Sequence, residues 1–198
     1  MQSMRPGHTL VDTALGAIGI AWSERGLTRL QLPGSDTAET ERRLTAPKNG
    51  FAPAECAPSA RVALETLLPP PILELARTLR RYAGGDAVDF DPVPLDLPGI
   101  GGFRRAIYRE ARKLRFGETI TYGQLAERAG HAGKARETGQ AMGSNRVPIV
   151  VPCHRVLAAG GAIGGFSAPG GTRTKLRLLE LEGALREVPA SGQASFGF

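Results

Sequence analysis

The chain changes character at Pro98–Gly102, a proline- and glycine-rich stretch, and this change limits the folds that it can adopt. Short alternating or apolar runs precede the stretch, as in a sheet, whereas apolar residues at helical spacing follow it. We therefore expect an α/β (α+β) chain with a small N-terminal α/β domain over 1–98 and a mostly helical C-terminal domain over 99–186. Residues 187–198 are expected to form a flexible tail.

Glycines divide the apolar runs of the first half, which is typical of a small meander of strands. The expected strands are Thr9–Leu15, Ala17–Trp22 and Leu27–Leu32. We then expect a helix over 35–43, a loop over 47–60 and an amphipathic helix over 72–82. The next segment, Val88–Leu97, alternates apolar residues with acids and prolines, so it predicts an edge strand.

The second half predicts a series of helices. We expect helices over Phe103–Leu114, Leu125–Ala129, Lys134–Gly143 and Lys175–Leu185, and a flexible glycine-rich loop over Gly160–Gly171. Thr121 can cap the second of these helices, and Gly130–Gly133 forms a tight turn before the third. Such a pair predicts a helix-turn-helix, whose second helix would approach DNA. By itself this signal is weak, because helix pairs are commoner as plain packing.

Positive charge is concentrated in the second half. Residues 1–99 carry 10 Lys and Arg against 12 Asp and Glu, whereas residues 100–186 carry 15 against 6. A polyanion such as DNA would therefore dock on the second half, because nucleic-acid affinity is largely phosphate neutralisation. The plainer alternative is a solvated basic face.

Membrane and disulfide signals are missing from the sequence. No apolar run is long enough to span a membrane, and the first residues do not form a secretory signal. Cys56 and Cys153 are too few for a disulfide framework, and neither belongs to a Cys-x-x-Cys pair. We expect a cytoplasmic protein in a reducing environment.

The run Val147–Val156 ends an apolar stretch on Cys153-His154-Arg155. Pro148 removes a ladder donor, so the run predicts an edge strand or an extended segment, with Cys153 at a chain corner. A histidine and an arginine beside a thiol favour its thiolate, which makes Cys153 the candidate nucleophile. The alternative is a buried structural cysteine. Neighbouring strand side chains point to opposite faces, so Cys153 and His154 would share chemistry only across a turn or a bridging water.

Taken together, these residues resemble the O6-alkylguanine-DNA alkyltransferases, also called methylated-DNA–protein-cysteine methyltransferases. The segment from Asn145 to Val156 matches the family signature Asn-x-x-Pro-x-x-x-Pro-Cys-His-Arg-Val throughout, and the likeness is strongest over about residues 103–183. The resemblance implies a ribonuclease H-like strand meander with a helix in the N-terminal domain. It implies a winged helix-turn-helix in the C-terminal domain.

The resemblance also implies DNA repair in a single turnover. Cys153 would take the alkyl group from O6-alkylguanine, and from O4-alkylthymine, in double-stranded DNA and keep it as a thioether. His154 would be the general base, acting through a bound water, and Glu182 would orient it. Asn145 would hold the segment around Cys153 in place by hydrogen bonds.

Further residues are assigned by the resemblance to DNA and to a base flipped out of the duplex. Tyr122 would crowd the target phosphate and protonate the leaving guanine, and Arg136 would fill the vacated place. The remaining DNA contacts would be Ala135, Gly139 and Arg155, and the alkylguanine pocket would comprise Met142, Val156, Gly164, Phe166 and Ser167. Considered alone, Tyr122 could equally be core and Arg136 a solvated helix residue.

The implied reaction needs no cofactor, because a sulfur nucleophile displaces a group from saturated carbon once the leaving base is protonated. Some relatives carry a structural zinc, but the first half offers only Cys56 and His8 as Cys or His ligands, so we expect no metal. We expect a monomer without membrane association, with cooperative binding to DNA left open.

Two other functions are compatible with parts of the sequence. The first is a non-catalytic alkyltransferase-like protein that binds damaged DNA, and Cys153 argues against it because such proteins replace the acceptor cysteine. The second is a Cys-His hydrolase, which would need an oxyanion hole. A hydrolase would leave the helix pair and the basic half unexplained.

Overall fold

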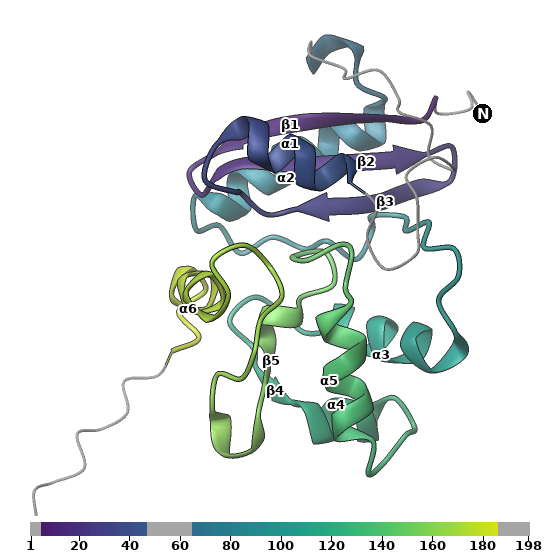
Figure 1. Cartoon of the computed structure of the whole chain (residues 1–198), viewed down its shortest axis with the longest axis vertical. Helices are drawn as coiled ribbons and strands as arrows, with labels where there is room; N and C mark the ends of the chain where they lie inside the picture. Colours follow the sequence, from purple (N-terminus) through teal and green to yellow (C-terminus); the bar gives the residue numbers. More distant parts are fainter. Residues whose placement is uncertain (1–4, 47–64, 186–198) are drawn as a thin grey trace, which may run out of the picture.

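The computed structural model describes residues 5–46 and 65–185, which form two packed parts (Figure 1). Strands with two flanking helices make up the N-terminal part, and the C-terminal part is mostly helical. The α/β fold class expected from the sequence is therefore confirmed. The predicted loop at 47–60, Cys56 and the predicted tail at 187–198 lie outside the described residues.

The N-terminal part contains an antiparallel meander with the strand order β1-β2-β3. Its strands are β1 (Gly7–Thr13), β2 (Gly16–Ser23) and β3 (Gly26–Gln31), so the predicted meander is confirmed. The turn before β3 requires a glycine, because Gly26 has a φ of +150° and a Cβ there would lie 2.5 Å from the Pro94 carbonyl oxygen. This close approach lets residues 94–96 lie against the edge of β3.

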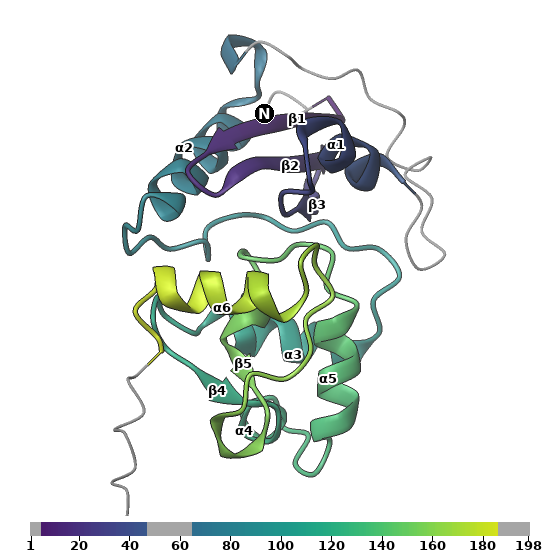
Figure 2. The same cartoon turned by 60° about the vertical axis from the view of Figure 1, so that its left-hand side comes forward.

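A helix covers each face of this sheet (Figures 1 and 2). Helix α1 (Thr37–Thr45) packs on β2 and β3, and Asp36 caps it by accepting a hydrogen bond of 2.7 Å from the Glu39 amide. Helix α2 (Pro70–Ala83) packs against β1 and follows the short 3₁₀ helix η2 (Glu65–Leu67). The helices predicted over 35–43 and 72–82 are thus confirmed, with ends displaced by one or two residues.

The edge strand predicted over Val88–Leu97 is wrong. The segment is irregular and forms an isolated parallel bridge between Leu27 and Leu95. The Leu27 amide donates to the Pro94 carbonyl at 2.8 Å, and the Asp96 amide donates to the Leu27 carbonyl at 2.9 Å. Prolines at 92 and 94 have no N–H to donate, so the ladder does not continue along the segment.

Helices around a short strand pair form the C-terminal part (Figure 2). The helices are α3 (Gly102–Arg112), α4 (Tyr122–Arg128), α5 (Ala135–Gly143) and α6 (Thr172–Leu181). Strand β4 (Ile120–Thr121) pairs in parallel with β5 (Val156–Leu157), which precedes the 3₁₀ helix η4 (Ala159–Gly161). Thr121 caps α4 in a capping box with Gln124, as expected, and α4 packs against α5 as the predicted helix pair.

The end of α6 differs from its prediction. The helix ends at Leu181 rather than Leu185, because Glu182 is its C-cap and Gly183 adopts a left-handed conformation with a φ of +63°. Glu182 is only 5% exposed despite its charge, so its carboxylate must find partners inside the protein.

The run before Cys153 is not the edge strand or extended segment that its sequence predicts. Residues 147–150 form turns, with Ile149 at a φ of +70°. Asn145 holds both ends of these turns, because its Oδ1 accepts from the Val147 amide at 3.0 Å and its Nδ2 donates to the Val151 carbonyl at 2.8 Å. These bonds satisfy the backbone locally, so the segment needs no strand partner.

A continuous hydrophobic core connects the two parts. It includes Trp22 and Leu79 from the N-terminal part and Ile107 and Val151 from the C-terminal part, each at most 1% exposed. Because burial of apolar surface is the main favourable term in folding, this shared core fixes the two parts against each other. Within the residues that the structure describes, no helix is long and apolar enough to cross a lipid bilayer.

Candidate active site

Cys153 begins the 3₁₀ helix η3 (Cys153–Arg155), directly after the turns that Asn145 holds. The residue is 6% exposed and lines a cavity of about 420 Å³. The cavity is bordered by Tyr122, Gly139, Met142, Gly143, Cys153, Gly165, Phe166 and Ser167. A volume of this size is typical of small-molecule sites, so a ring of the size of a nucleobase can approach the sulfur.

Helix α5 supplies one wall of this cavity. Ala135, Gly139 and Met142 recur at helical spacing on one face, and Gly139 is open because no atom lies within 4 Å of the position a Cβ would take. Ala135 and Arg136 are exposed in the first turn of the same helix. The structure therefore places these predicted DNA contacts on the helix that borders the thiol.

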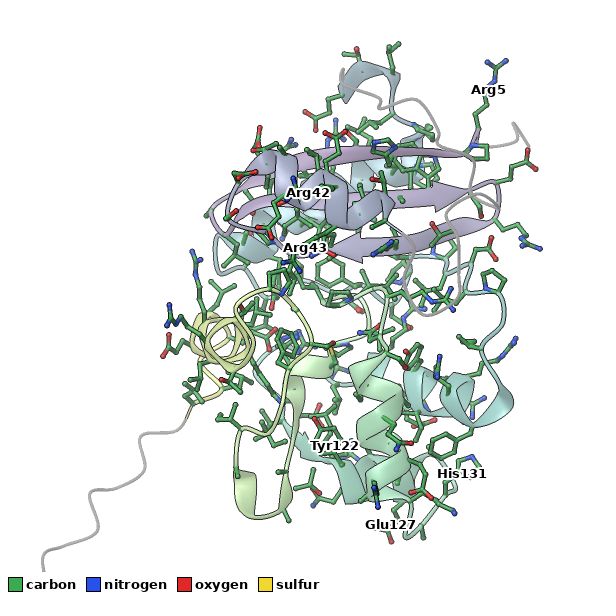
Figure 3. The ribbon with its side chains drawn as sticks, viewed as in Figure 1. Arg5, Arg42, Arg43, Tyr122, Glu127 and His131 are labelled. Carbon is green, nitrogen blue, oxygen red and sulfur yellow. The ribbon has the colours of Figure 1, made fainter. Side chains whose placement is uncertain are left out.

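Tyr122 lies at the start of α4, close to α5 and away from the labelled arginines of α1 (Figure 3). Burial, and then the charge of a Cys153 thiolate, raise the pKa of Tyr122, so its hydroxyl stays protonated near neutral pH. Gly164 faces the Tyr122 ring, since a Cβ there would lie 3.7 Å from it. Val156 does not line this cavity, because it is fully buried in β5.

His154 is completely buried behind the cysteine. Its Nε2 lies 2.7 Å from Oε1 of Glu182, and its Nδ1 makes no hydrogen bond to any described residue. Because an ionised carboxylate only accepts, Nε2 carries the proton and Nδ1 keeps a lone pair. Burial lowers the pKa of His154, although the hydrogen bond that His154 donates to Glu182 opposes that effect. The imidazole is therefore neutral near pH 7, as a general base must be.

Glu182 is the centre of the buried polar network. Its Oε1 accepts hydrogen bonds from His154 Nε2 (2.7 Å), Tyr82 Oη (2.7 Å) and Arg155 Nη2 (2.9 Å), and its Oε2 accepts from Arg155 Nε (2.8 Å) and the Gly117 amide (3.1 Å). Burial by itself raises the pKa of Glu182, but the hydrogen bonds from His154 and Arg155 outweigh burial and hold the pKa well below its usual range. The carboxylate is thus ionised at every physiological pH.

The prediction that Arg155 contacts DNA is wrong. Its side chain is 5% exposed, and its Nε and Nη2 both donate to Glu182. Its Nη1 donates to the Leu114 carbonyl at 2.6 Å, so the guanidinium is committed inside the protein. A buried carboxylate needs a buried cation, and the arginine beside the histidine serves that need rather than binding phosphate.

Sequence reasoning missed two buried residues of this site. Lys175 is fully buried, donates to the Val156 carbonyl at 2.6 Å and lies 5.8 Å from the centroid of the Tyr122 ring. Burial lowers the pKa of Lys175 to about 8. Its place in α6, seven residues before Glu182 on the same helix face, was the available signal. Tyr82 gave no such signal, because it belongs to the apolar face of α2 in the other part.

No group of three or more His, Cys, Asp or Glu side chains in the described ranges could hold a metal ion. His8, one of the two possible zinc ligands of the first half, lies 3.2 Å from a Glu41 carboxylate oxygen. The other, Cys56, lies outside the described residues, so the expected absence of zinc stays a prediction.

The fold and the site together define a class: a two-part α/β protein that carries a buried cysteine, with a His-Glu pair behind it, beside a helix pair. A family model described as "6-O-methylguanine DNA methyltransferase, DNA binding domain" matches residues 102–184. The chain is 33% identical over 184 residues to a methylated-DNA–protein-cysteine methyltransferase of Mycolicibacterium paratuberculosis. The aligned region covers 93% of this chain and 95% of that protein. It is also 33% identical over 193 residues to the human protein of that name, covering 95% and 86% respectively.

Solved structures agree with these relatives. The crystal structure of Mycobacterium tuberculosis OGT in complex with DNA is 28% identical and superposes with a TM-score of 0.65, covering 89% of this chain and 92% of that one. The chain belongs to the methylated-DNA–protein-cysteine methyltransferase family.

Proposed function

We propose that this protein repairs DNA by moving the alkyl group of O6-alkylguanine, and of O4-alkylthymine, onto Cys153 in a single irreversible turnover. The observation that carries the proposal is the position of Cys153, which lines a base-sized cavity beside α5 and precedes the buried His154–Glu182 pair. The two sequence relatives described above are named methylated-DNA–protein-cysteine methyltransferases, and the similar Mycobacterium tuberculosis OGT was crystallised with DNA.

Proton transfer prepares the nucleophile in this mechanism. The Nδ1 lone pair of His154 accepts the thiol proton of Cys153 through a bridging water, and Glu182 stabilises the resulting imidazolium. The thiolate sulfur then attacks the alkyl carbon, so a carbon–sulfur bond forms as the carbon–oxygen bond to the base breaks. The hydroxyl of Tyr122 supplies a proton to the leaving guanine, and the proton released by the His154 imidazolium returns through water to the Tyr122 oxygen. A thioether is not hydrolysed under these conditions, so each protein acts once.

DNA would reach the cysteine along α5. Chemistry on O6 of guanine requires the nucleotide to leave the base stack, at a cost of a few kcal/mol. We propose that Arg136 enters the duplex at the vacated place, while Ala135 and Gly139 let the backbone approach the helix closely. Met142, Phe166 and Ser167 would then surround the flipped base next to the sulfur.

The remaining expectations extend this proposal. We propose that residues 1–98 and 99–186 are the two domains, and that the protein acts as a monomer on double-stranded DNA. We also propose a cytoplasmic location, where reducing conditions keep the Cys153 thiol available.

Mass spectrometry after reaction with damaged DNA tests the function. The protein is incubated with duplex DNA containing one O6-methylguanine, and its intact and peptide masses are measured. We expect one added methyl group on the peptide that contains Cys153, with a yield limited to one per protein. Tight binding with an unchanged mass would instead identify a damage-binding protein, and repeated turnover on an ester would identify a hydrolase.

A further inference from the structure

Tyr82 belongs to α2 in the N-terminal part, yet its hydroxyl group ends in the buried network of the C-terminal part. The residue is 0% exposed. Its ring makes edge contacts with Phe90, at 5.7 Å between centroids, and with Phe116, at 6.0 Å. Its hydroxyl donates to Oε1 of Glu182 at 2.7 Å and lies 3.3 Å from Nε2 of His154. Rings from both parts thus hold a single hydroxyl group against the His-Glu pair.

The hydroxyl of Tyr82 shares its acceptor with His154. Oε1 of Glu182 accepts from Tyr82, His154 and Arg155, so these donors compete for the charge of the same oxygen. The bond from Tyr82 is as short as the bond from His154, at 2.7 Å each. A carboxylate oxygen that already accepts a hydrogen bond from a phenol attracts the His154 N–H less strongly.

The charge balance around His154 gives this competition a direction. The groups that act on the imidazole are Glu182 and Tyr82, which lie within hydrogen-bond distance of it, and the charges of Arg155 and Lys175. Burial, Arg155 and Lys175 all lower the pKa of His154, and Glu182 raises it. The hydroxyl of Tyr82 draws charge from Glu182, so it too lowers the pKa of His154. Burial and the charge of Glu182 raise the pKa of Tyr82 itself, so this donor stays protonated throughout the working range.

We infer that Tyr82 is a positioning residue by which the N-terminal part sets the orientation and basicity of His154. This inference rests on the proposed alkyl transfer and adds a participant from the part of the chain that carries none of the family signature. It also gives the shared core a role in the reaction, because α2 must pack against the C-terminal part for the hydroxyl to reach Glu182.

A hydroxyl deletion tests the inference. In Tyr82→Phe the ring and its contacts with Phe90 and Phe116 remain, and Glu182 keeps its bonds from His154 and Arg155. We expect the acid limb of the pH–rate profile for methyl transfer to move to higher pH, because His154 becomes more basic. At a pH on that acid limb the rate constant should fall about threefold to tenfold, while the two proteins converge at alkaline pH. The matched control is Tyr108→Phe, which removes a buried hydroxyl bonded to the Ala141 carbonyl at 3.0 Å.

Two further measurements separate this inference from the proposed function. The pKa of His154, followed by nitrogen-15 NMR without DNA, should rise in Tyr82→Phe and stay at the parent value in Tyr108→Phe. Incorporation of 3-fluorotyrosine at position 82 retains the hydroxyl and makes it a stronger donor, so it should lower the pKa of His154. This protein tests the inference even if the phenylalanine variant does not fold. Failure of the parent protein to accept a methyl group would refute the proposed function alone. An active parent with unchanged His154 titration in both altered proteins would overturn the role of Tyr82.

Discussion

His154 and Glu182 are joined by a hydrogen bond of 2.7 Å between Nε2 and Oε1, and neither side chain has any exposed surface. Burial lowers the pKa of the histidine, whereas hydrogen bonds keep the pKa of the carboxyl group low against the effect of its burial. The pair therefore rests as a neutral imidazole and a carboxylate. In that state Nδ1 of His154 has a free lone pair that can accept the thiol proton of Cys153.

Removing the nucleophile should separate binding from transfer. Cys153→Ala deletes the sulfur but leaves the walls formed by α5 and Tyr122 in place. We expect no methyl gain by mass spectrometry and an affinity for alkylated duplex DNA, measured by gel shift, within a few-fold of the parent. A residual methylated product in this variant would show that another group accepts the alkyl.

The buried carboxylate should matter for both stability and rate. Glu182→Gln leaves the buried Arg155 without its counter-charge, so we expect a loss of about 3–5 kcal/mol in the free energy of unfolding. The transfer rate should fall about 100-fold or more, because the base loses its orientation. Denaturant unfolding and single-turnover kinetics measure the two effects. Glu180→Gln, at an exposed position of α6, is the matched control and should change neither.

The same carboxyl group should make stability depend on acid. Its folded-state pKa lies below the ordinary value of 4.5, so its stabilising contribution is fully present above about pH 4.5 and is lost as the pH falls toward the folded value. The difference in thermal stability between the parent and Glu182→Gln should therefore shrink as the pH drops below 4.5. A difference that stays constant down to pH 3 would contradict the assigned ionisation.

Arg136 should act through DNA rather than through the fold. The residue is exposed in the first turn of α5, so Arg136→Ala should leave thermal stability within about 0.5 kcal/mol of the parent. We expect affinity for damaged duplex to fall about tenfold and the repair rate to fall with it. Arg173→Ala, an exposed arginine in α6, is the control. Repair of duplex DNA by Arg136→Ala at the parent rate would show that the intercalating residue is a different one.

The turns before Cys153 should depend on Asn145. Asn145→Ala removes two buried hydrogen bonds, which contribute about 1 kcal/mol each, and leaves the Val147 amide and Val151 carbonyl without their partner. We expect a loss of about 2–4 kcal/mol and a slower transfer, because the cysteine loses its fixed place. Asn145→Asp retains the acceptor for the Val147 amide but sets a buried carboxylate oxygen against the Val151 carbonyl, so it should not restore the lost stability. Equal stability of the alanine variant and the parent, by denaturant unfolding, would refute this role.

Several elements were predictable because their causes are local. The glycines at 16 and 26 divide the strand meander, and Thr121 with Gln124 three residues later encodes the start of α4. Two predictions failed where backbone hydrogen bonding overrode an apolar pattern. The apolar alternation of Val88–Leu97 favours a strand, but its prolines have no N–H to donate, so only a single bridge forms, at Leu95. Asn145 likewise turns a β-branched run into a compact turn through side-chain bonds.

The sequence by itself determined the reactive groups and the helices that present them. Cysteine, histidine and arginine are adjacent in the chain, and helical spacing puts Ala135, Gly139 and Met142 on one face of α5. Only the tertiary structure decided what these groups contact. In the folded chain Arg155 donates hydrogen bonds to Glu182 rather than contacting DNA. Tyr82, 100 positions away in the sequence, donates to the same carboxylate. The physical reason is desolvation. A buried charge must be paired with groups that the folded core brings next to it, and those groups recur at no regular spacing in the sequence.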